Sequence, residues 1–170
     1  MNKYLIRKNH FIYKMLETLE EARKELIRVD HLVYVSLKYT RTVDMIKHAI
    51  KRIISSYDFL NEALLLYSKE NKKILEIPST PVSKRETLMD LFKEDEFIIK
   101  NVMLHTWLRK VDKIEKSQAS REFRKHVTMT LEVEGKEVKV DIEKIYEYYN
   151  LLQEYNDYVN KMIIGEKEEE

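Results

Sequence analysis

The sequence predicts an all-α fold, a single helical bundle of four to five helices with a small β-hairpin, about residues 127–140, before the last helix. A long helical seam, a scarcity of helix-breaking residues and one short stretch of period-two alternation support this prediction. The seam has nine residues spaced alternately four and three apart, as in helices that pack side by side; they are Tyr39, Val43, Ile46, Ile50, Ile53, Tyr57, Leu60, Leu64 and Tyr67.

The composition restricts the possibilities further. The 170 residues suffice for one domain, residues 1–170, that buries a core without help from metals or disulfides. With two Gly and two Pro, few positions interrupt a helix. The absence of cysteine excludes disulfides, thiolate metal sites and cysteine nucleophiles. Because the net charge is only +1, any contact with nucleic acid would come from a local basic patch.

The sequence also predicts a location. The amino terminus lacks the apolar core and cleavage site of a signal peptide, and no apolar run approaches the roughly 18 residues of a membrane span. We therefore expect a cytoplasmic protein without a membrane partner. Charged residues form 36% of the chain and glutamine occurs only at Gln118 and Gln153, a combination typical of proteins from hot environments.

The first two helices follow from apolar periodicity. Apolar residues recur at helical steps over residues 10–28, which predicts the first helix. Asp30 is a candidate N-cap for a second helix that carries the seam and reaches about Asn71, and polar and β-branched residues favour a break within 36–42. Two prolines three residues apart then place the main loop at residues 71–83.

The third predicted helix runs from Ser83 to about Lys116. Ser83 and Glu86 match the pattern of a capping box at its start. Apolar residues cover more than half of its circumference, as expected for an element with neighbours on several sides. We therefore expect it to be the central helix.

The last part of the chain combines the hairpin with a final helix. Gly135 marks the turn of the hairpin, between two stretches of alternating apolar residues. Asp141 is the predicted N-cap of the last helix, and Gly165 is placed to end it. Residues 166–170 are expected to form a disordered acidic tail.

Several enzyme classes lack their motifs in this sequence. Bundles that hold two metals carry Glu-x-x-His pairs, which do not occur here, and Asp44 and His48 fall on flanking and outer positions of the seam helix. The sequence also has no Gly-x-Ser-x-Gly elbow, glycine-rich phosphate loop or dinucleotide fingerprint. We therefore expect no metal and no cofactor.

One basic segment carries a chemical signal. Arg121 and His126 lie at the junction between a helix and a strand, with Arg124 and Lys125 between them. A histidine can move a proton to or from a 2′-hydroxyl or a leaving oxygen near neutral pH, while an arginine stabilises charge on the phosphate. This pattern points to metal-free cleavage of RNA, with Arg121 and His126 as catalytic residues and Arg124 and Lys125 as substrate-binding residues.

The Arg-x4-His spacing, followed by a short non-helical stretch and a last helix that begins Asp141-Ile142-Glu143-Lys144-Ile145-Tyr146, resembles the HEPN superfamily. The similarity in architecture extends over roughly residues 30–163. This resemblance implies a compact, usually dimeric helical bundle in which Arg121 and His126 face a cleft shared by two subunits. It further implies RNA as a partner and metal-independent endoribonuclease activity, an activity that some members of the superfamily lack.

Two other arginine–histidine pairs are weaker candidates. Arg41 and His48 are seven residues apart, on a stripe opposite the seam that is expected to face solvent. His105 and Arg109 are four residues apart on the third predicted helix and could line a groove near the basic segment. A histidine in such a position is more often a half-buried side chain whose hydrogen bonds are all made within the protein.

A non-enzymatic function is the alternative. In this interpretation the chain is a helical interaction or regulatory module, with a homodimer or a protein partner held by the seam and the last helix. Tyrosine is enriched at protein interfaces, and the last helix is aromatic on more than one side, with Tyr146, Tyr148, Tyr155 and Tyr158.

Overall fold

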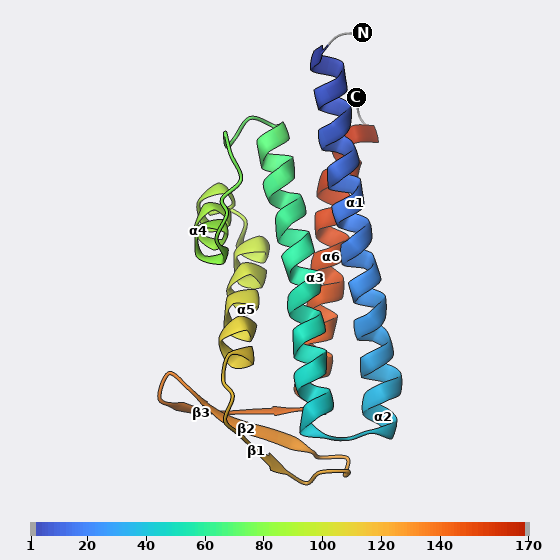
Figure 1. Ribbon diagram of the computed structural model, residues 1–170, viewed down its shortest axis with the longest axis vertical. Coiled ribbons are helices and arrows are strands. Elements are labelled where there is room, and N and C mark those ends of the chain that lie inside the picture. The colour runs from blue at the N-terminus through green and yellow to red at the C-terminus, as the bar shows by residue number, and fades with distance from the viewer. Residues whose placement is uncertain (1–2, 169–170) are drawn as a thin grey trace.

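The computed structural model describes residues 3–168, with side chains described for residues 9–165. Within this range the chain is mostly helical, with a small antiparallel sheet before the last helix (Figure 1). The helices are α1 (Lys3–His31), α2 (Leu37–Tyr39), α3 (Val43–Glu70), α4 (Pro81–Leu91), α5 (Glu96–Asp112) and α6 (Ile142–Glu168). A π-helical turn, η1 (Leu32–Ser36), joins α1 to α2, and the strands are β1 (Ser117–Ser120), β2 (Thr128–Val133) and β3 (Lys136–Asp141).

Helix α3 is the centre of the bundle. It packs against α1, α4, α5 and α6, and Figure 1 shows it between the α1–α6 pair and the α4–α5 pair. The prediction that residues 83–116 form the central helix is therefore wrong. Eight of the nine seam residues, from Val43 to Tyr67, are buried, which confirms that part of the seam. Tyr39 is 79% exposed because it ends α2, before the chain turns at residues 40–42.

The break between the first two long helices lies later than Asp30. No cap forms at Asp30, because α1 continues through the π-helical turn into α2. The carboxylate of Asp30 instead accepts a hydrogen bond from the Tyr149 hydroxyl. The break falls at residues 40–42, inside the range predicted for it. Thr42 is the N-cap of α3, because its hydroxyl accepts a hydrogen bond from the backbone N–H of Met45.

The third predicted helix is two helices. Residues 92–95 separate α4 from α5, and the Asp95 carboxylate caps α5 by accepting from the N–H of Ile98. The capping box of α4 joins Thr80 and Ser83, with Pro81 at the first helical position, and does not involve Glu86. The predicted loop at 71–83 is confirmed, apart from its last three residues, which begin α4.

The predicted hairpin is confirmed as β2 and β3, which pair antiparallel. Its turn uses Glu134 and Gly135, both at positive φ (52° and 78°), a combination typical of a tight hairpin turn. A third strand, β1, pairs antiparallel with the other side of β2, so a purely all-α description does not hold. The sheet crosses one end of the bundle (Figure 1), and its buried residues join the core; they are Met129, Leu131, Val133 and Val140.

The last helix begins as predicted. The Asp141 carboxylate accepts a hydrogen bond from the N–H of Lys144, and apolar residues at helical spacing along α6, among them Ile145, Leu152 and Ile163, are buried. Gly165 does not end the helix, which continues to Glu168, so residues 166–168 are helical and residues 169–170 lie outside the described residues. Most tyrosines of α6 turn inward, since Tyr148, Tyr149 and Tyr155 are buried.

The buried seam of α3 makes a direct prediction about stability. Leu60 is fully buried, and replacing it with alanine leaves a cavity, so Leu60→Ala should lower the free energy of unfolding by about 2–5 kcal/mol. Leu75 is 91% exposed, and Leu75→Ala, the same chemical change, should alter that free energy by less than about 0.5 kcal/mol. Urea unfolding followed by circular dichroism measures both. Equal effects of the two substitutions would contradict the assignment of α3 as the core helix.

Candidate functional site

The basic segment forms an exposed loop that is held against the start of α3. We call residues 121–126, which lie between β1 and β2, the basic loop. The N–H of Phe123 donates to the carbonyl oxygen of Arg41 at 2.7 Å, and the N–H of Val43 donates to Oε1 of Glu122 at 3.3 Å. The negative carboxylate of Glu122 thus sits at the positive end of the α3 dipole. These two bonds fix the loop relative to the bundle.

The conformation of the basic loop separates its acidic side chain from its basic ones. Glu122 turns inward, and its Oε2 atom is buried without a hydrogen-bond partner among the described residues. Arg121 and Phe123 adopt left-handed backbone conformations, with φ of 56° and 64°, which side chains other than glycine adopt rarely. Such conformations are often kept at functional sites.

The four predicted site residues are all exposed. None of the side chains of Arg121, Arg124, Lys125 and His126 forms a hydrogen bond or an ion pair within the part of the chain that the structure describes. None of them lines the three pockets found in that part. Their catalytic and substrate-binding roles stay predictions. In the weaker candidate pair Arg41 and His48, the backbone carbonyl of Arg41 helps to hold the loop, and the His48 side chain is exposed.

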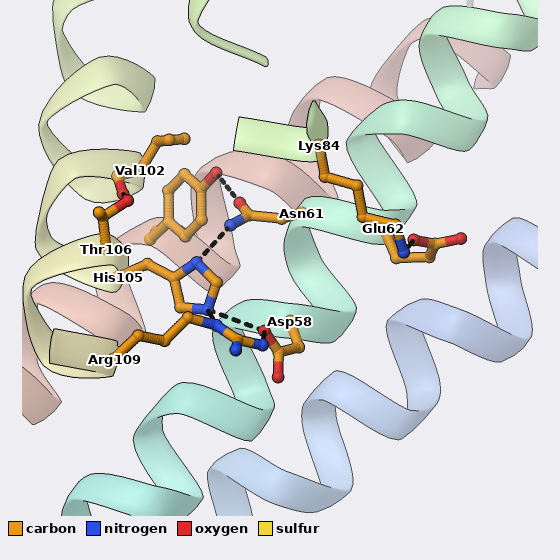
Figure 2. Close-up of polar contacts among 9 residues, drawn as sticks. Asp58, Asn61, Glu62, Lys84, Val102, His105, Thr106 and Arg109 are labelled. Atoms are coloured by element: carbon orange, nitrogen blue, oxygen red, sulfur yellow. Dashed lines mark hydrogen bonds and ion pairs between the residues drawn. The ribbon is translucent and has the colours of Figure 1, made fainter. Parts of the chain in front are cut away.

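A second candidate site is a pocket of about 560 Å³ between α3, α4 and α5. Its polar wall consists of Asp58 and Asn61 from α3 and of His105 and Arg109 from α5 (Figure 2). Each pair is spaced three or four residues apart, so both side chains of a pair project from one face of their helix. The helices therefore bring four polar groups together across their interface.

Asp58 is the acceptor at which two donors meet. Its Oδ1 atom lies 2.8 Å from Nε2 of His105 and 2.9 Å from Nη2 of Arg109 (Figure 2). No described residue hydrogen-bonds to the other carboxylate oxygen, Oδ2, and the side chain is 42% exposed. The carboxylate is therefore held by one oxygen and offers the other to the pocket.

Asn61 and Tyr155 fix the orientation of the His105 ring. The hydroxyl of Tyr155, from α6, donates to Oδ1 of Asn61 at 2.8 Å, so the amide nitrogen of Asn61 faces Nδ1 of His105, 3.2 Å away. An amide nitrogen can only donate, so Nδ1 accepts from Asn61. The other ring nitrogen, Nε2, lies 2.8 Å from Oδ1 of Asp58 and 3.3 Å from Nε of Arg109. Both ring nitrogens are thus engaged, and His105 acts in this arrangement as a positioning residue.

A parallel pair of contacts stiffens the same interface one turn away. The hydroxyl of Tyr57 donates to Oδ1 of Asn101 at 2.8 Å, and the Tyr57 ring stacks on His105 with 5.6 Å between ring centroids. Burial raises the pKa of the Tyr57 hydroxyl, which therefore stays protonated and remains a donor. Two polar rows, Tyr57–Asn101 and Asn61–His105, thus fix the register between α3 and α5.

The electrostatics of Asp58 reflect this environment. Burial by itself would raise the pKa of the Asp58 carboxyl, but the hydrogen bonds from His105 and Arg109, together with the positive charge of the Arg109 guanidinium, outweigh burial and hold that pKa below its ordinary value of 3.8. Asp58 is therefore ionised at neutral pH, and its negative charge is partly balanced by the Arg109 guanidinium.

Basic side chains surround the rest of the pocket. Lys84 pairs with Glu62 at 2.8 Å, and Lys110 pairs with the exposed Glu134 at 2.6 Å. Arg85 makes a looser contact with Glu86 at 3.8 Å, and Lys113 has no ion pair among residues 9–165. Five lining residues are cationic and two are acidic. The lining thus carries a net positive charge.

The described residues contain no ready set of metal ligands. Among them, no group of three or more His, Asp and Glu side chains is arranged to hold a metal ion, and Asp44 and His48 are both exposed.

A membrane-spanning segment is also not found: none of the helices within residues 3–168 combines the length and the apolar character that crossing a membrane requires.

Half of the polar wall is recognisable from the sequence. His105 and Arg109 were recognisable from their spacing, although the groove they line is not beside the basic loop. Asp58 lies 15 residues beyond Val43, where the loop docks, which is about 22 Å along α3. Asp58 and Asn61 could not be recognised as site residues from the sequence, because His105, the partner of both, is 47 and 44 residues away from them.

Comparison with known proteins finds no matching family model, no similar curated protein and no similar solved structure.

The lowered pKa of Asp58 predicts a pH-dependent contribution to stability. A carboxyl whose pKa is lower in the folded state stabilises the protein above its ordinary, unfolded pKa of 3.8, and that contribution is lost as pH falls through the folded value. The free energy of unfolding of the wild type should therefore exceed that of Asp58→Asn by a constant amount above about pH 5, and the difference should shrink below about pH 4. Urea unfolding across this pH range measures it.

Asp90→Asn is the matched control for this experiment. Asp90 is exposed and has no ion pair among the described residues, so its substitution should change the free energy of unfolding by less than about 0.5 kcal/mol. A wild-type advantage over Asp58→Asn that grows on acidification would contradict the assigned hydrogen bonds.

Proposed function

We propose that the protein is a HEPN-like helical protein that binds RNA through the basic loop. The observation that carries this proposal is the inward orientation of Glu122, the one acidic residue of the loop, which caps α3. The outer surface of the loop therefore presents Arg121, Arg124, Lys125 and His126 without an acidic neighbour from the loop itself. Phosphate contacts from lysine and arginine supply most of the affinity of proteins for nucleic acid.

Phe123 supports single-stranded RNA as the ligand. Its side chain is 77% exposed, in the middle of the four basic residues, although a large aromatic ring is usually buried. Unstacked bases bind to exposed aromatic rings, and each such stack contributes about 1–3 kcal/mol. A cationic loop with an exposed ring can contact the phosphates and a base together.

Cleavage is the second part of the proposal. His126 would accept the proton of a 2′-hydroxyl as its oxygen attacks the adjacent phosphorus, and Arg121 would stabilise the charge that develops on the phosphate oxygens. The bond from phosphorus to the 5′-oxygen breaks, and the leaving oxygen takes a proton from a second imidazolium or from water. In a homodimer, as the HEPN resemblance implies, the second copy's basic loop would supply that group.

An interaction module remains the alternative function, and α1 offers the observation that favours it. Tyr13 and Ile27 of α1 and Tyr34 of the π-helical turn that follows it are 69%, 53% and 52% exposed, at steps of fourteen and seven residues along one stripe. A partner helix, including α1 of a second copy, could cover such a stripe. Under this alternative RNA does not bind, and the basic loop serves only to cap α3.

Substitutions in the basic loop test RNA binding. A labelled single-stranded RNA of mixed sequence should bind the wild type, and Arg124→Ala/Lys125→Ala should weaken that binding by about tenfold or more and reduce its salt dependence. Phe123→Ala should weaken it by a similar factor through the loss of stacking. Fluorescence anisotropy at several salt concentrations measures both effects.

The control for this measurement is Lys93→Ala/Lys100→Ala, which removes the same charge from exposed positions outside the loop and the pocket. It should leave RNA affinity within about twofold of the wild type. If the loop variants and this control bind RNA equally well, the basic loop is not the binding surface.

Cleavage is tested separately, with a pool of structured RNAs incubated at about pH 5 to 8 in the presence of a chelator. The wild type should cleave, and Arg121→Ala and His126→Ala should each lose activity by about a hundredfold or more. Sedimentation analysis of the same samples reports whether the active species is a dimer. RNA that is bound but stays intact with the wild type would remove the catalytic part of the proposal and leave the binding part standing.

A further inference from the structure

We propose that the binding surface of the basic loop extends onto α2, where the exposed ring of Tyr39 is a second stacking platform beside Phe123. This inference rests on the proposed function, because it takes RNA binding by the basic loop as its starting point. It adds a residue of α2 to the site and defines the ligand as a strand that offers two unpaired bases at once. The two rings are 79% and 77% exposed, and they are the most exposed aromatic side chains among residues 9–165.

The fold brings these two rings to the same corner of the molecule. The N–H of Phe123 donates to the carbonyl oxygen of Arg41, two residues beyond Tyr39, and Figure 1 shows the connection between β1 and β2 beside the turn that joins α2 to α3. Because consecutive Cα atoms are about 3.8 Å apart, this bond keeps the Cα atoms of Tyr39 and Phe123 within about 14 Å of each other. About four stacked nucleotides, at roughly 3.4 Å each, cover that distance. One short strand can therefore reach both rings.

Packing of the core explains neither ring. Tyr39 ends α2 just before the chain turns at residues 40–42, and its side chain leaves the buried seam there. Phe123 has a φ of 64°, a backbone conformation that glycine or asparagine adopts at a lower cost. Stacking on a base, in contrast, requires an aromatic ring that is open to solvent. A nucleic-acid ligand therefore accounts for two aromatic residues that the bundle itself does not need.

The surface around Tyr39 is cationic, as the basic loop is. Lys38 is exposed and Arg41 is half-buried, and neither side chain forms an ion pair among the described residues. Residues 32–43 include no acidic residue, and Glu122 of the basic loop is occupied as the cap of α3. Positive charge without acidic neighbours favours a polyanion over a protein surface of mixed charge. The phosphates of a strand stacked on both rings would contact Lys38 and Arg41 as well as the cations of the loop.

Tyr13 provides the matched control for Tyr39. It is also a tyrosine with an exposed ring, at 69%, but it lies in the first half of α1. About 27 Å of α1 separates Tyr13 from His31, where the π-helical turn before α2 begins. Tyr13→Ala therefore removes an equally exposed ring at a position that the proposed strand does not reach.

Fluorescence anisotropy with a labelled 2′-O-methyl RNA tests the inference. Such a strand has no free 2′-hydroxyl to attack the phosphorus, so it stays intact whether or not the protein cleaves RNA. With a strand of about eight nucleotides, Tyr39→Ala should weaken binding by about fivefold or more through the loss of one stack. Tyr39→Phe, which keeps the ring, and Tyr13→Ala should both bind within about twofold of the wild type.

A strand of the same length made of abasic sugars separates stacking from charge. It keeps every phosphate and has no base, so the wild type and Tyr39→Ala should bind it equally within about twofold. Lys38→Ala should instead weaken the binding of both strands and reduce the salt slope by about one. Circular dichroism confirms that each variant is folded, as expected for substitutions of exposed side chains.

The outcomes distinguish failure of this inference from failure of the proposed function. A wild type that binds neither strand contradicts RNA binding by the basic loop and, with it, the role of Tyr39. Binding that Arg124→Ala/Lys125→Ala weakens, but that Tyr39→Ala leaves within about twofold of the wild type, rejects the second platform alone and leaves the proposed function standing. Equal weakening by Tyr39→Ala and Tyr13→Ala, or equal weakening of both strands by Tyr39→Ala, also rejects the second platform.

Discussion

Helix α3 is covered by other elements on most sides, and three of the polar side chains that it buries, Ser56, Tyr57 and Asn61, bond to neighbouring helices. A buried donor or acceptor without a partner costs about 1–3 kcal/mol. The hydroxyl of Ser56 donates to the carbonyl oxygen of Ala22 in α1, Tyr57 donates to Asn101 in α5, and Asn61 bonds to both α5 and α6. These bonds have direction, unlike apolar contacts. Together they set how α1, α5 and α6 are aligned along the central helix.

The polar pocket follows from the same requirement. Once Asn61 is fixed between Tyr155 and His105, the histidine ring has one orientation, and its second nitrogen points at Asp58. Arg109, one turn further along α5, reaches the same carboxylate oxygen. A network that begins as a solution for buried polar groups in the core thus ends at the surface with a fixed carboxylate and a fixed guanidinium. Its inner members stabilise register, and its outer members are available to a ligand.

The sequence predicts the features that are local or periodic. The buried run from Val43 to Tyr67, the hairpin and the Asp141 cap all follow from spacing over a few residues. The break between α4 and α5 was missed because residues 92–95 contain no proline or glycine, and the Asp95 cap that marks it resembles many other aspartates. Strand β1 was missed because Ser117–Ser120 has no apolar alternation and forms only by pairing with β2.

The candidate sites divide in the same way. His105 and Arg109 could be paired from their positions on one helix, whereas Asp58 and Asn61 join them only through helix packing. The basic loop was visible as a cluster of charge, but the inward turn of Glu122 depends on a contact with residue 43, which is 79 positions away. Charge composition is thus readable from the sequence, while the direction in which each charge points is a property of the tertiary structure.

The cap formed by Glu122 also makes the basic loop and the first turn of α3 one mechanical unit. The loop cannot lift from the bundle without exposing the N–H of Val43, and the first turn cannot fray without releasing the carboxylate that anchors the loop. Any event that pulls on the outer side chains is therefore transmitted to the start of the central helix. Because that helix contacts most of the bundle, a disturbance at this one edge reaches the core through a single covalently continuous element.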